Sequence, residues 1–323
     1  MRLCLSLIAA AALLMGGYVA YGFYRYHAPM GSEQTVMIAP RTGAQAVVAQ
    51  LNAQGLVPPL MVIAAPLFLS GSIPSLKAGE YHFEAGLSPA QVIDRIARGA
   101  VVVHKITIVE GWNALMVRVT LDSEPLLSGT LPTSIPEGSV LPETIYFSRG
   151  EARSAVLARM QQSRETLLDT LWEKRAPDLP VATKEEALIL ASIVEKETGV
   201  ADERPLVAGV FVNRLRQGMM LQSDPTVVYG VEMKHNGASM DRPLSRADLT
   251  TDTPYNTYTR TGLPPTPICN PGAKAIEAVL NPQATDALYF VATGTGGHRF
   301  AATLAEHEAN VAAYRKAMRE AGR

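Results

Sequence analysis

The first two dozen residues constrain the fold of this chain more than any other segment. From Leu3 to Tyr24, about 22 residues, the sequence contains no charged residue. A helix rises ~1.5 Å per residue, so this run would extend roughly 33 Å, about the thickness of a bilayer's hydrocarbon core. We therefore expect residues 1–24 to form a transmembrane anchor and the rest of the chain to fold outside the membrane.

A cleaved signal peptide is the alternative for the same run. The apolar region of a signal peptide usually measures about 7–15 residues. Cleavage after Ala20 would also place the bulky Tyr18 in the cleavage motif. These two points favour the anchor. Arg2 flanks the run on one side and Arg25 with His27 on the other, so the basic residues do not fix its orientation.

Charge and cysteine content exclude two further classes of protein. The net charge of the 323 residues is -1 and no basic stripe appears, which argues against a nucleic-acid partner. The two cysteines, Cys4 and Cys269, lie in an apolar run and in a distant loop, so they do not form a disulfide framework. A hydrophobic content of 47% suffices for one large domain or two ordinary ones.

Residues 25–100 are predicted to form a small α+β module. Two strands are expected at 35–39 and 77–83, and two helices at 43–54 and 88–98. Ser88 with Pro89 provides an N-cap and a first-turn proline for the second helix.

Residues 101–323 are predicted to form a larger α+β domain. The pattern indicates a strand at 101–109, loops at 124–142 and 241–272, and a hairpin pairing 288–292 with 298–300. Long loops in compact domains are often functional. Helices are expected at 151–174, 184–198, 202–218 and 304–318.

Two glutamates stand near the end of the helix predicted at 184–198. Residues two positions apart are separated by about 200° around a helix, so Glu195 and Glu197 cannot act as one carboxylate pair. Glu197 shares its face with Ile193 and Val194, and apolar surroundings raise the pKa of a carboxyl. Glu197 is therefore the candidate general acid. The alternative is that both glutamates only solvate the end of the helix.

Polar residues follow in a segment that Pro225 is expected to hold as a turn. Gln222, Asp224 and Thr226 could reach a polar ligand from it. The alternative is that Asp224-Pro225 simply initiates the turn.

Aromatic and amide groups meet at Tyr255, Asn256 and Tyr258 in the long loop. Such groups suit pyranose rings, which offer both apolar faces and hydroxyls. Tyrosines can equally anchor a loop to the core.

Metal and nucleotide sites have weaker support. His298 and His307 have no clustered third ligand for a metal, and ordinary polar contacts explain them better. The glycines at 294–297 lie in a predicted hairpin and not between a strand and a helix, so they are not a nucleotide fingerprint.

These residues closely resemble the motifs of the membrane-anchored endolytic murein transglycosylases of bacteria, the MltG or YceG-like family. The matches cover most of residues 101–320. One departure is Val140-Leu141-Pro142, where relatives usually have aromatic residues, so no stacking contact is expected there. The matching motifs are Glu195-Lys-Glu-Thr198, Phe211-Val-Asn-Arg-Leu215, Leu221-Gln-Ser-Asp-Pro-Thr-Val-Val-Tyr-Gly230, Leu244-Ser-Arg246, Pro254-Tyr-Asn-Thr-Tyr258, Gly262-Leu-Pro-Pro265, Asn270-Pro-Gly272, Tyr289-Phe-Val291 and Gly297-His298.

The resemblance implies cleavage within peptidoglycan glycan strands at the MurNAc-GlcNAc linkage, leaving 1,6-anhydro-MurNAc ends. The family's catalytic glutamate falls on Glu197. Residues 25–100 would be a LysM-like subdomain, and residues 101–323 the YceG-like catalytic domain. The catalytic domain would lie on the outer, periplasmic side of the bacterial plasma (inner) membrane. The resemblance also implies cooperation with cell-wall synthases, the penicillin-binding proteins.

The expected mechanism needs no metal or organic cofactor. Glu197 would protonate the glycosidic oxygen while the 6-hydroxyl of the same sugar attacks its anomeric carbon. The sugars would be positioned by Gln222, Asp224, Tyr255, Asn256 and Tyr258. Two alternatives stay open: a membrane-tethered glycan-binding protein without catalysis, and a pyridoxal-phosphate lyase that would need a Schiff-base lysine such as Lys196.

Overall fold

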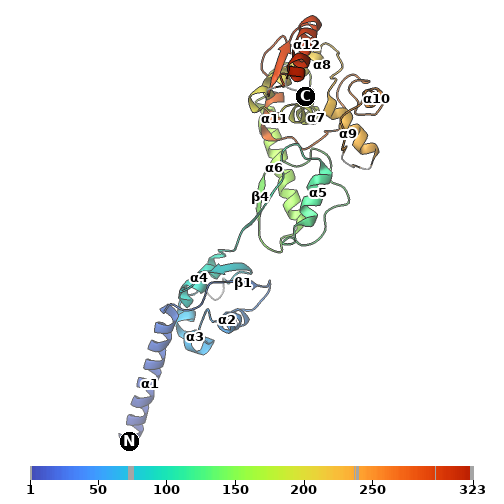
Figure 1. Cartoon of the computed structure of the whole chain (residues 1–323). Helices are drawn as coiled ribbons and strands as arrows, with labels where there is room; N and C mark the ends of the chain where they lie inside the picture. Colours follow the sequence, from blue (N-terminus) through green and yellow to red (C-terminus); the bar gives the residue numbers. More distant parts are fainter. Residues whose placement is uncertain (1, 72–75, 236, 238–239, 295, 321–323) are drawn as a thin grey trace. The chain divides into compact units, whose positions relative to one another are not determined.

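The computed structural model describes residues 2–71, 76–235, 237, 240–294 and 296–320. Contacts divide the chain into two compact units. The first consists of Met1–Lys105 with Tyr146–Glu151, and the second of Ile106–Ile145 with Ala152–Arg323. Both units combine helices with short strands (Figure 1), which confirms the expected mixed α+β class. The division differs from the expected one by a few residues at the boundary and by the short return of the chain to the first unit.

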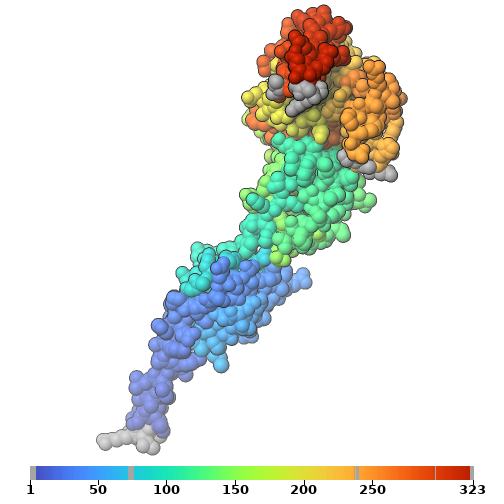
Figure 2. All heavy atoms as spheres, viewed as in Figure 1, coloured from blue at the N-terminus to red at the C-terminus, as the bar shows by residue number. Residues whose placement is uncertain are grey.

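Helix α1 (Arg2–His27) contains the uncharged run and continues three residues beyond it. Its side chains are exposed over most of its length, with Leu13 78% exposed (Figure 2). Among the described residues it is the one helix long and apolar enough to cross a membrane, and a signal sequence would pass the same test. Only its last turns are packed, since Gly22 and Tyr26 are buried against the rest of the first unit.

The first unit is built around an antiparallel strand pair. Strand β1 (Gln34–Ile38) pairs with β2 (Gly79–Phe83), with Val36 opposite Tyr81. Helices α2 (Ala44–Ala53), α3 (Leu60–Leu69) and α4 (Pro89–Arg98) complete the core. Ser88 is the predicted N-cap and forms a capping box with Gln91, and Gly99 ends α4 in the left-handed conformation. Helix α3 was not predicted, because its uniformly apolar sequence has no periodicity.

The second unit has a helical core. Helix α7 (Lys184–Glu197) is buried on every side from Ala187 to Val194. It packs on α6 (Arg153–Glu173), α8 (Arg204–Arg216) and α11 (Ala273–Leu280). The predicted hairpin is confirmed as β5 (Tyr289–Ala292) paired with β6 (His298–Ala301), followed by α12 (Leu304–Glu320). The remaining elements are β3 (His104–Thr107), α5 (Ala114–Ser123), β4 (Thr144–Phe147), the 3₁₀ helix η2 (Ala201–Glu203), α9 (Asp224–Lys234) and α10 (Arg246–Thr250).

One difference from the sequence prediction lies in the polar segment around Pro225. Pro225 does not hold a turn: it occupies the first turn of helix α9, which begins at Asp224. Proline is compatible with that position because its missing N–H would have no partner inside the helix. The segment carrying α9 and α10 forms a bulge of its own on the second unit (Figure 2, orange).

Candidate active site

Helix α7 presents its two glutamates to different surroundings, as its geometry predicts. The side chain of Glu195 is 5% exposed. One of its carboxylate oxygens accepts the backbone N–H of Gly272 at 2.9 Å, and the other lies 3.4 Å from Arg204 Nη2. Glu195 therefore joins three segments of the core. The interpretation that both glutamates solvate the helix end is wrong.

The Glu197 carboxyl has the electrostatics of a general acid. Burial raises its pKa from an ordinary 4.5 to about 7, and the negative charge of Asp224 acts in the same direction. A hydrogen bond from Ser223 and the positive charges of His298 and Arg214 oppose this rise. A carboxyl with a pKa near neutrality retains its proton under conditions where an ordinary glutamate has lost it.

Ser223 holds Glu197 from an unusual position. It is the N-cap residue of α9, where a serine usually accepts a backbone N–H of the first turn. Its side chain makes no such bond and instead donates its hydroxyl to Glu197 Oε1. The backbone N–H of Ser223 donates to Thr257 Oγ1 at 3.0 Å, so the long loop fixes this arrangement. Helix α9 therefore lacks the N-cap hydrogen bond, which usually stabilises a helix by roughly 1 kcal/mol, because the Ser223 hydroxyl bonds to Glu197 instead.

The residue before Ser223 is strained. Gln222 has φ +51°, a left-handed conformation that non-glycine residues seldom adopt. Its N–H donates to the Thr257 carbonyl at 3.1 Å, and its side-chain oxygen lies 3.4 Å from Arg214 Nη1. Such strain persists only where surrounding contacts enforce it, and it is common at functional sites.

These groups surround a cavity of about 430 Å³, called here the catalytic pocket. Tyr258 extends across it and donates its hydroxyl to Asp224 Oδ1 at 2.6 Å. Burial and this hydrogen bond raise the pKa of Tyr258, so its proton is firmly held. The lining residues are Glu197, Arg214, Leu221, Gln222, Asp224, Tyr258, Phe290, Val291, Ala292, His298 and His307.

Two basic side chains in the pocket, Arg214 and His298, were not identified from the sequence as site residues. Arg214 is 7% exposed and donates to the Leu288 carbonyl at 2.6 Å and the Leu221 carbonyl at 2.8 Å. His298 is oriented by Glu203, which accepts from its backbone N–H at 2.8 Å and lies 2.7 Å from Nδ1. The spacing of more than 80 residues between Arg214 and His298 gives no sequence signal for their convergence.

The sequence model of the YceG-like family matches residues 36–313, which is most of the chain. The chain belongs to the YceG-like family. A YceG-like protein of Listeria monocytogenes, solved by crystallography, superposes with a TM-score of 0.52 at 26% identity, covering 86% of this chain and 99% of that one.

Two relatives carry a functional name. A protein of Bacillus subtilis (strain 168) named endolytic murein transglycosylase is 31% identical over an alignment of 264 positions, which covers 72% of this chain and 71% of the relative. A protein of Streptococcus pneumoniae serotype 2 with the same name is 27% identical over an alignment of 358 positions, which covers 95% of this chain and 64% of the relative.

The YceG-like chain brings four of the six expected site residues into the catalytic pocket: Glu197, Gln222, Asp224 and Tyr258. Asn256 is fully buried, so the expected sugar contact is wrong. Its side-chain amide donates to the carbonyls of Leu249 at 3.0 Å and Thr251 at 2.8 Å, which holds the long loop together.

Tyr255 also lies outside the pocket lining. Its ring packs edge-on against Tyr229 at 4.8 Å, and its hydroxyl lies 2.9 Å from Thr266 Oγ1. These contacts support the loop-anchoring alternative, and the expected substrate contact of Tyr255 stays a prediction. Thr226, by contrast, forms part of the network beneath the pocket, because its hydroxyl donates to the Ser223 carbonyl at 2.6 Å.

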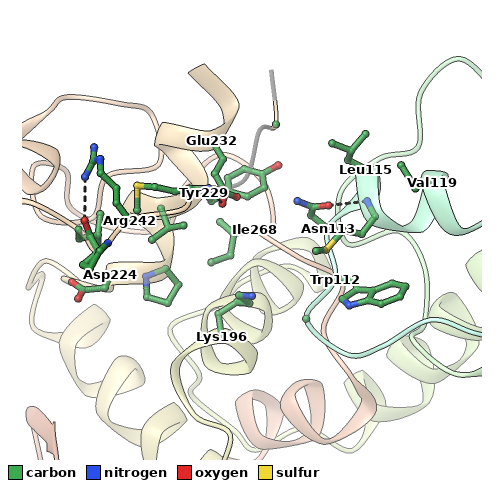
Figure 3. Close-up of a pocket in the computed structure, with 18 of the residues that line it drawn as sticks. Trp112, Asn113, Leu115, Val119, Lys196, Asp224, Tyr229, Glu232, Arg242 and Ile268 are labelled. Carbon is green, nitrogen blue, oxygen red and sulfur yellow. Dashed lines mark hydrogen bonds between the residues drawn. The ribbon is translucent and has the colours of Figure 1, made fainter. Parts of the chain in front are cut away.

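A second and larger cavity, of about 800 Å³, lies in the same unit (Figure 3). Asp224 lines both cavities, and Lys196 lines only the second. Lys196 thus faces away from Glu197, as expected. His298 and His307 both line the catalytic pocket, but within the described residues no group of three His, Cys, Asp or Glu side chains is arranged to hold a metal.

Proposed function

We propose that this YceG-like chain is an endolytic murein transglycosylase that cleaves MurNAc-GlcNAc linkages within glycan strands and leaves 1,6-anhydro-MurNAc ends. Family membership and the names of its relatives support the class of reaction. The observation that carries the assignment to Glu197 is its carboxyl, whose pKa is about 7, in a polar pocket.

The chemistry needs one acid that later acts as a base. Glu197 donates its proton to the glycosidic oxygen, and the bond from that oxygen to the anomeric carbon breaks. The 6-hydroxyl of the same sugar bonds to the anomeric carbon, and its proton passes to the Glu197 carboxylate. The charges of Arg214 and His298 stabilise that carboxylate between the two steps, since both lower the pKa of Glu197.

Asp224 has a separate role in this proposal. Its carboxylate lines the pocket and faces positive charge developing on the sugar.

The same carboxylate also supports a second candidate function. A hydrolase places a nucleophile or a base opposite its acid, and Asp224 could activate water in that way. The two reactions differ in their products, since hydrolysis leaves reducing ends.

The anchor and the cell-wall setting belong to the same proposal. Helix α1 would hold the chain in the bacterial plasma membrane with both units on the outer side, where peptidoglycan lies. Residues 25–100 would act as a LysM-like glycan-binding module. Cell-wall synthases, the penicillin-binding proteins, would supply nascent strands.

Mass spectrometry of uncrosslinked glycan strands incubated with the full chain tests the proposal. We expect internal fragments ending in 1,6-anhydro-MurNAc from the wild type and from Glu185→Gln, an exposed glutamate in the first turn of the same helix. Glu197→Gln should form none. Reducing ends would favour hydrolysis through Asp224, and the absence of products from the wild type would favour a binding protein.

A further inference from the structure

The larger cavity lies next to the catalytic pocket, and the two share one lining residue. Asp224, the first residue of α9, lines both spaces, and Lys196 precedes Glu197 in the last turn of α7. Figure 3 shows Trp112, Asn113 and Leu115 on one side of this cavity and Asp224 and Arg242 on the other, with Lys196 between them. A group attached to a sugar at Glu197 is therefore close to this cavity, on the side of Asp224.

One wall of this cavity is apolar and uncovered. Leu115, Met116 and Val119 of α5 line it, and they are 45%, 47% and 58% exposed. Ile268 and Val228 add further aliphatic groups. Contiguous exposed apolar side chains on a protein surface mark a binding site.

The charged residues of the cavity define what it would bind. Arg242 is neutralised by Asp248, whose two oxygens lie 2.6 and 2.9 Å from its guanidinium. Among the residues that the structure describes, Lys196 forms no ion pair, and the Glu232 carboxylate accepts only the Met240 N–H, at 3.0 Å. One cation and one anion thus stay open to a ligand. Neutral polar groups suited to sugar hydroxyls are few, since Asn113 is engaged in capping α5.

We propose that this cavity, the stem subsite, binds the peptide that hangs from the MurNAc residue held at Glu197. A peptide stem of small apolar residues with carboxylates and an ammonium group matches an aliphatic wall flanked by Lys196 and Glu232. The inference rests on the proposed function, because the stem reaches the cavity only from a sugar in the catalytic pocket. If the stem binds there, the enzyme selects glycan strands that carry peptide stems.

Tryptophan fluorescence tests binding independently of cleavage. The chain has two tryptophans, and Trp112 lines the stem subsite, so Trp172→Phe leaves Trp112 as the reporter. We titrate this full-length variant in detergent with muramyl pentapeptide and, separately, with chitotetraose, which has no stem. A saturable emission change with the muramyl peptide alone supports the proposal. Lys196→Gln in the same background should weaken binding about tenfold.

Cleavage kinetics provide the second test. We compare kcat/KM for glycan strands with stems and for strands stripped of stems by an amidase. The kcat/KM for strands with stems should exceed that for stripped strands more than tenfold in the wild type, and the two values should become nearly equal in Val119→Gln. Leu304 on α12 is an apolar residue of similar exposure, so Leu304→Gln should keep the wild-type ratio. Glu197→Gln should retain peptide binding and lose cleavage of both strands.

Several results would overturn the stem subsite. An equal response of Trp112 to both ligands, or a ratio near one in the wild type, would remove the peptide as the occupant. A dimer in sedimentation that Val119→Gln dissociates, without any peptide response, would assign the apolar wall to a second copy of the chain. Peptide binding without cleavage of any strand would instead contradict the proposed function and leave the stem subsite standing.

A different observation concerns helix α3 in the first unit. All ten residues from Leu60 to Leu69 are apolar, and residues 56–76 include no charged side chain. Ile63, Pro66 and Leu67 are buried in the core, while Met61, Phe68 and Leu69 are 78%, 77% and 71% exposed. A helix that is apolar on every face is usually surrounded by protein or by lipid.

Helix α3 packs directly on α1. A side chain at Gly22 of α1 would collide with the Val62 carbonyl, so the glycine allows the two helices to approach closely. Gly22 lies two residues before the end of the uncharged run, which is the boundary of the expected membrane span. The exposed side of α3 is therefore at the level of that boundary.

We infer that α3 is seated in the outer leaflet beside α1, with Met61, Phe68 and Leu69 in contact with lipid acyl chains. The first unit would then be fixed to the bilayer surface by two elements, where a single helix would let it rotate freely. Interfacial helices of this kind bury their apolar face about 5–10 Å into the membrane.

Site-specific fluorescence of the full chain in liposomes tests this placement. In a Cys4→Ser background, where Cys269 is fully buried and unreactive, Phe68→Cys is labelled with NBD. Lipids with a nitroxide high on the acyl chain should quench it at least threefold more than aqueous iodide does. Val103→Cys, an exposed apolar site in the same unit, should show the reverse. Leu13→Cys, in the middle of α1, reports on the span itself.

Each outcome separates the possibilities. Quenching of residue 68 by iodide and not by lipid, with residue 13 quenched by lipid, would overturn the seating of α3 alone. Protection of residue 68 from both quenchers would assign α3 to a protein contact. Absence of lipid quenching at residue 13 would remove the anchor and the inference with it.

Discussion

Replacing Ser223 with alanine should move the alkaline limit of activity upward. The Ser223 hydroxyl donates to Glu197 and lowers the pKa of that carboxyl against the effect of burial. A hydrogen bond to a charged group is worth about 1.5–3 kcal/mol, and one pKa unit corresponds to about 1.36 kcal/mol. Loss of this donor should therefore raise the pKa of Glu197 by about 1–2 units, from about 7 toward 8 or 9.

The sign follows from the role of the acid. Glu197 works in its protonated form, so activity is present below its pKa and is lost as the pH rises through it. The profile of kcat/KM against pH for uncrosslinked strands should fall near pH 7 in the wild type. In Ser223→Ala the same fall should occur about 1–2 pH units higher, although the rate at low pH will be reduced because the carboxyl is less firmly held.

Ser192→Ala is the matched control for this experiment. Ser192 is a fully buried serine of the same helix, and its hydroxyl donates to the Ile189 carbonyl and not to Glu197. The substitution should lower stability and leave the alkaline limit where it is. A limit that stays in place in Ser223→Ala, or moves to lower pH, would refute the assignment of that limit to Glu197.

Four further predictions concern the catalytic pocket and the long loop beside it. Glu197→Gln should lower the rate by about 10²–10⁴ but raise the free energy of unfolding. The pKa of Glu197 is about 7 in the folded protein against an ordinary 4.5. The wild type therefore loses up to about 3 kcal/mol of stability as the pH rises from 4.5 to 7. Urea denaturation at pH 4.5 and 8 measures this difference, which should appear only at pH 8. Asn256→Ala should lower the free energy of unfolding by about 2–3 kcal/mol in the same assay, whereas a small effect would contradict its role in holding the loop. Tyr258→Phe removes the donor to Asp224 and should lower kcat/KM about tenfold with an unchanged melting temperature. His298→Gln should shift the alkaline limit of kcat/KM upward, since His298 lowers the pKa of Glu197; a downward shift would contradict that contribution.

Local signals were sufficient for elements with clear patterns. The N-cap serine Ser88 and the pattern of Thr183 with Glu186 three residues later indicate the starts of α4 and α7, and both residues form capping boxes in the structure. Helix α3 and the start of α9 could not be predicted in this way. The first is apolar without a period, and a proline after Asp224 is compatible with a turn as well as with the first turn of a helix.

The sequence by itself determined that one uncharged run could span a bilayer, that Glu195 and Glu197 face different directions, and which turn-rich segments bear polar groups. These are properties of neighbouring residues and of helix geometry. Only the tertiary structure decided that Ser223 donates to Glu197, that His298 and Arg214 face the same pocket, and that Asn256 is fully buried. The pKa of Glu197 depends on those contacts, because it reflects burial and charges from segments far apart along the chain.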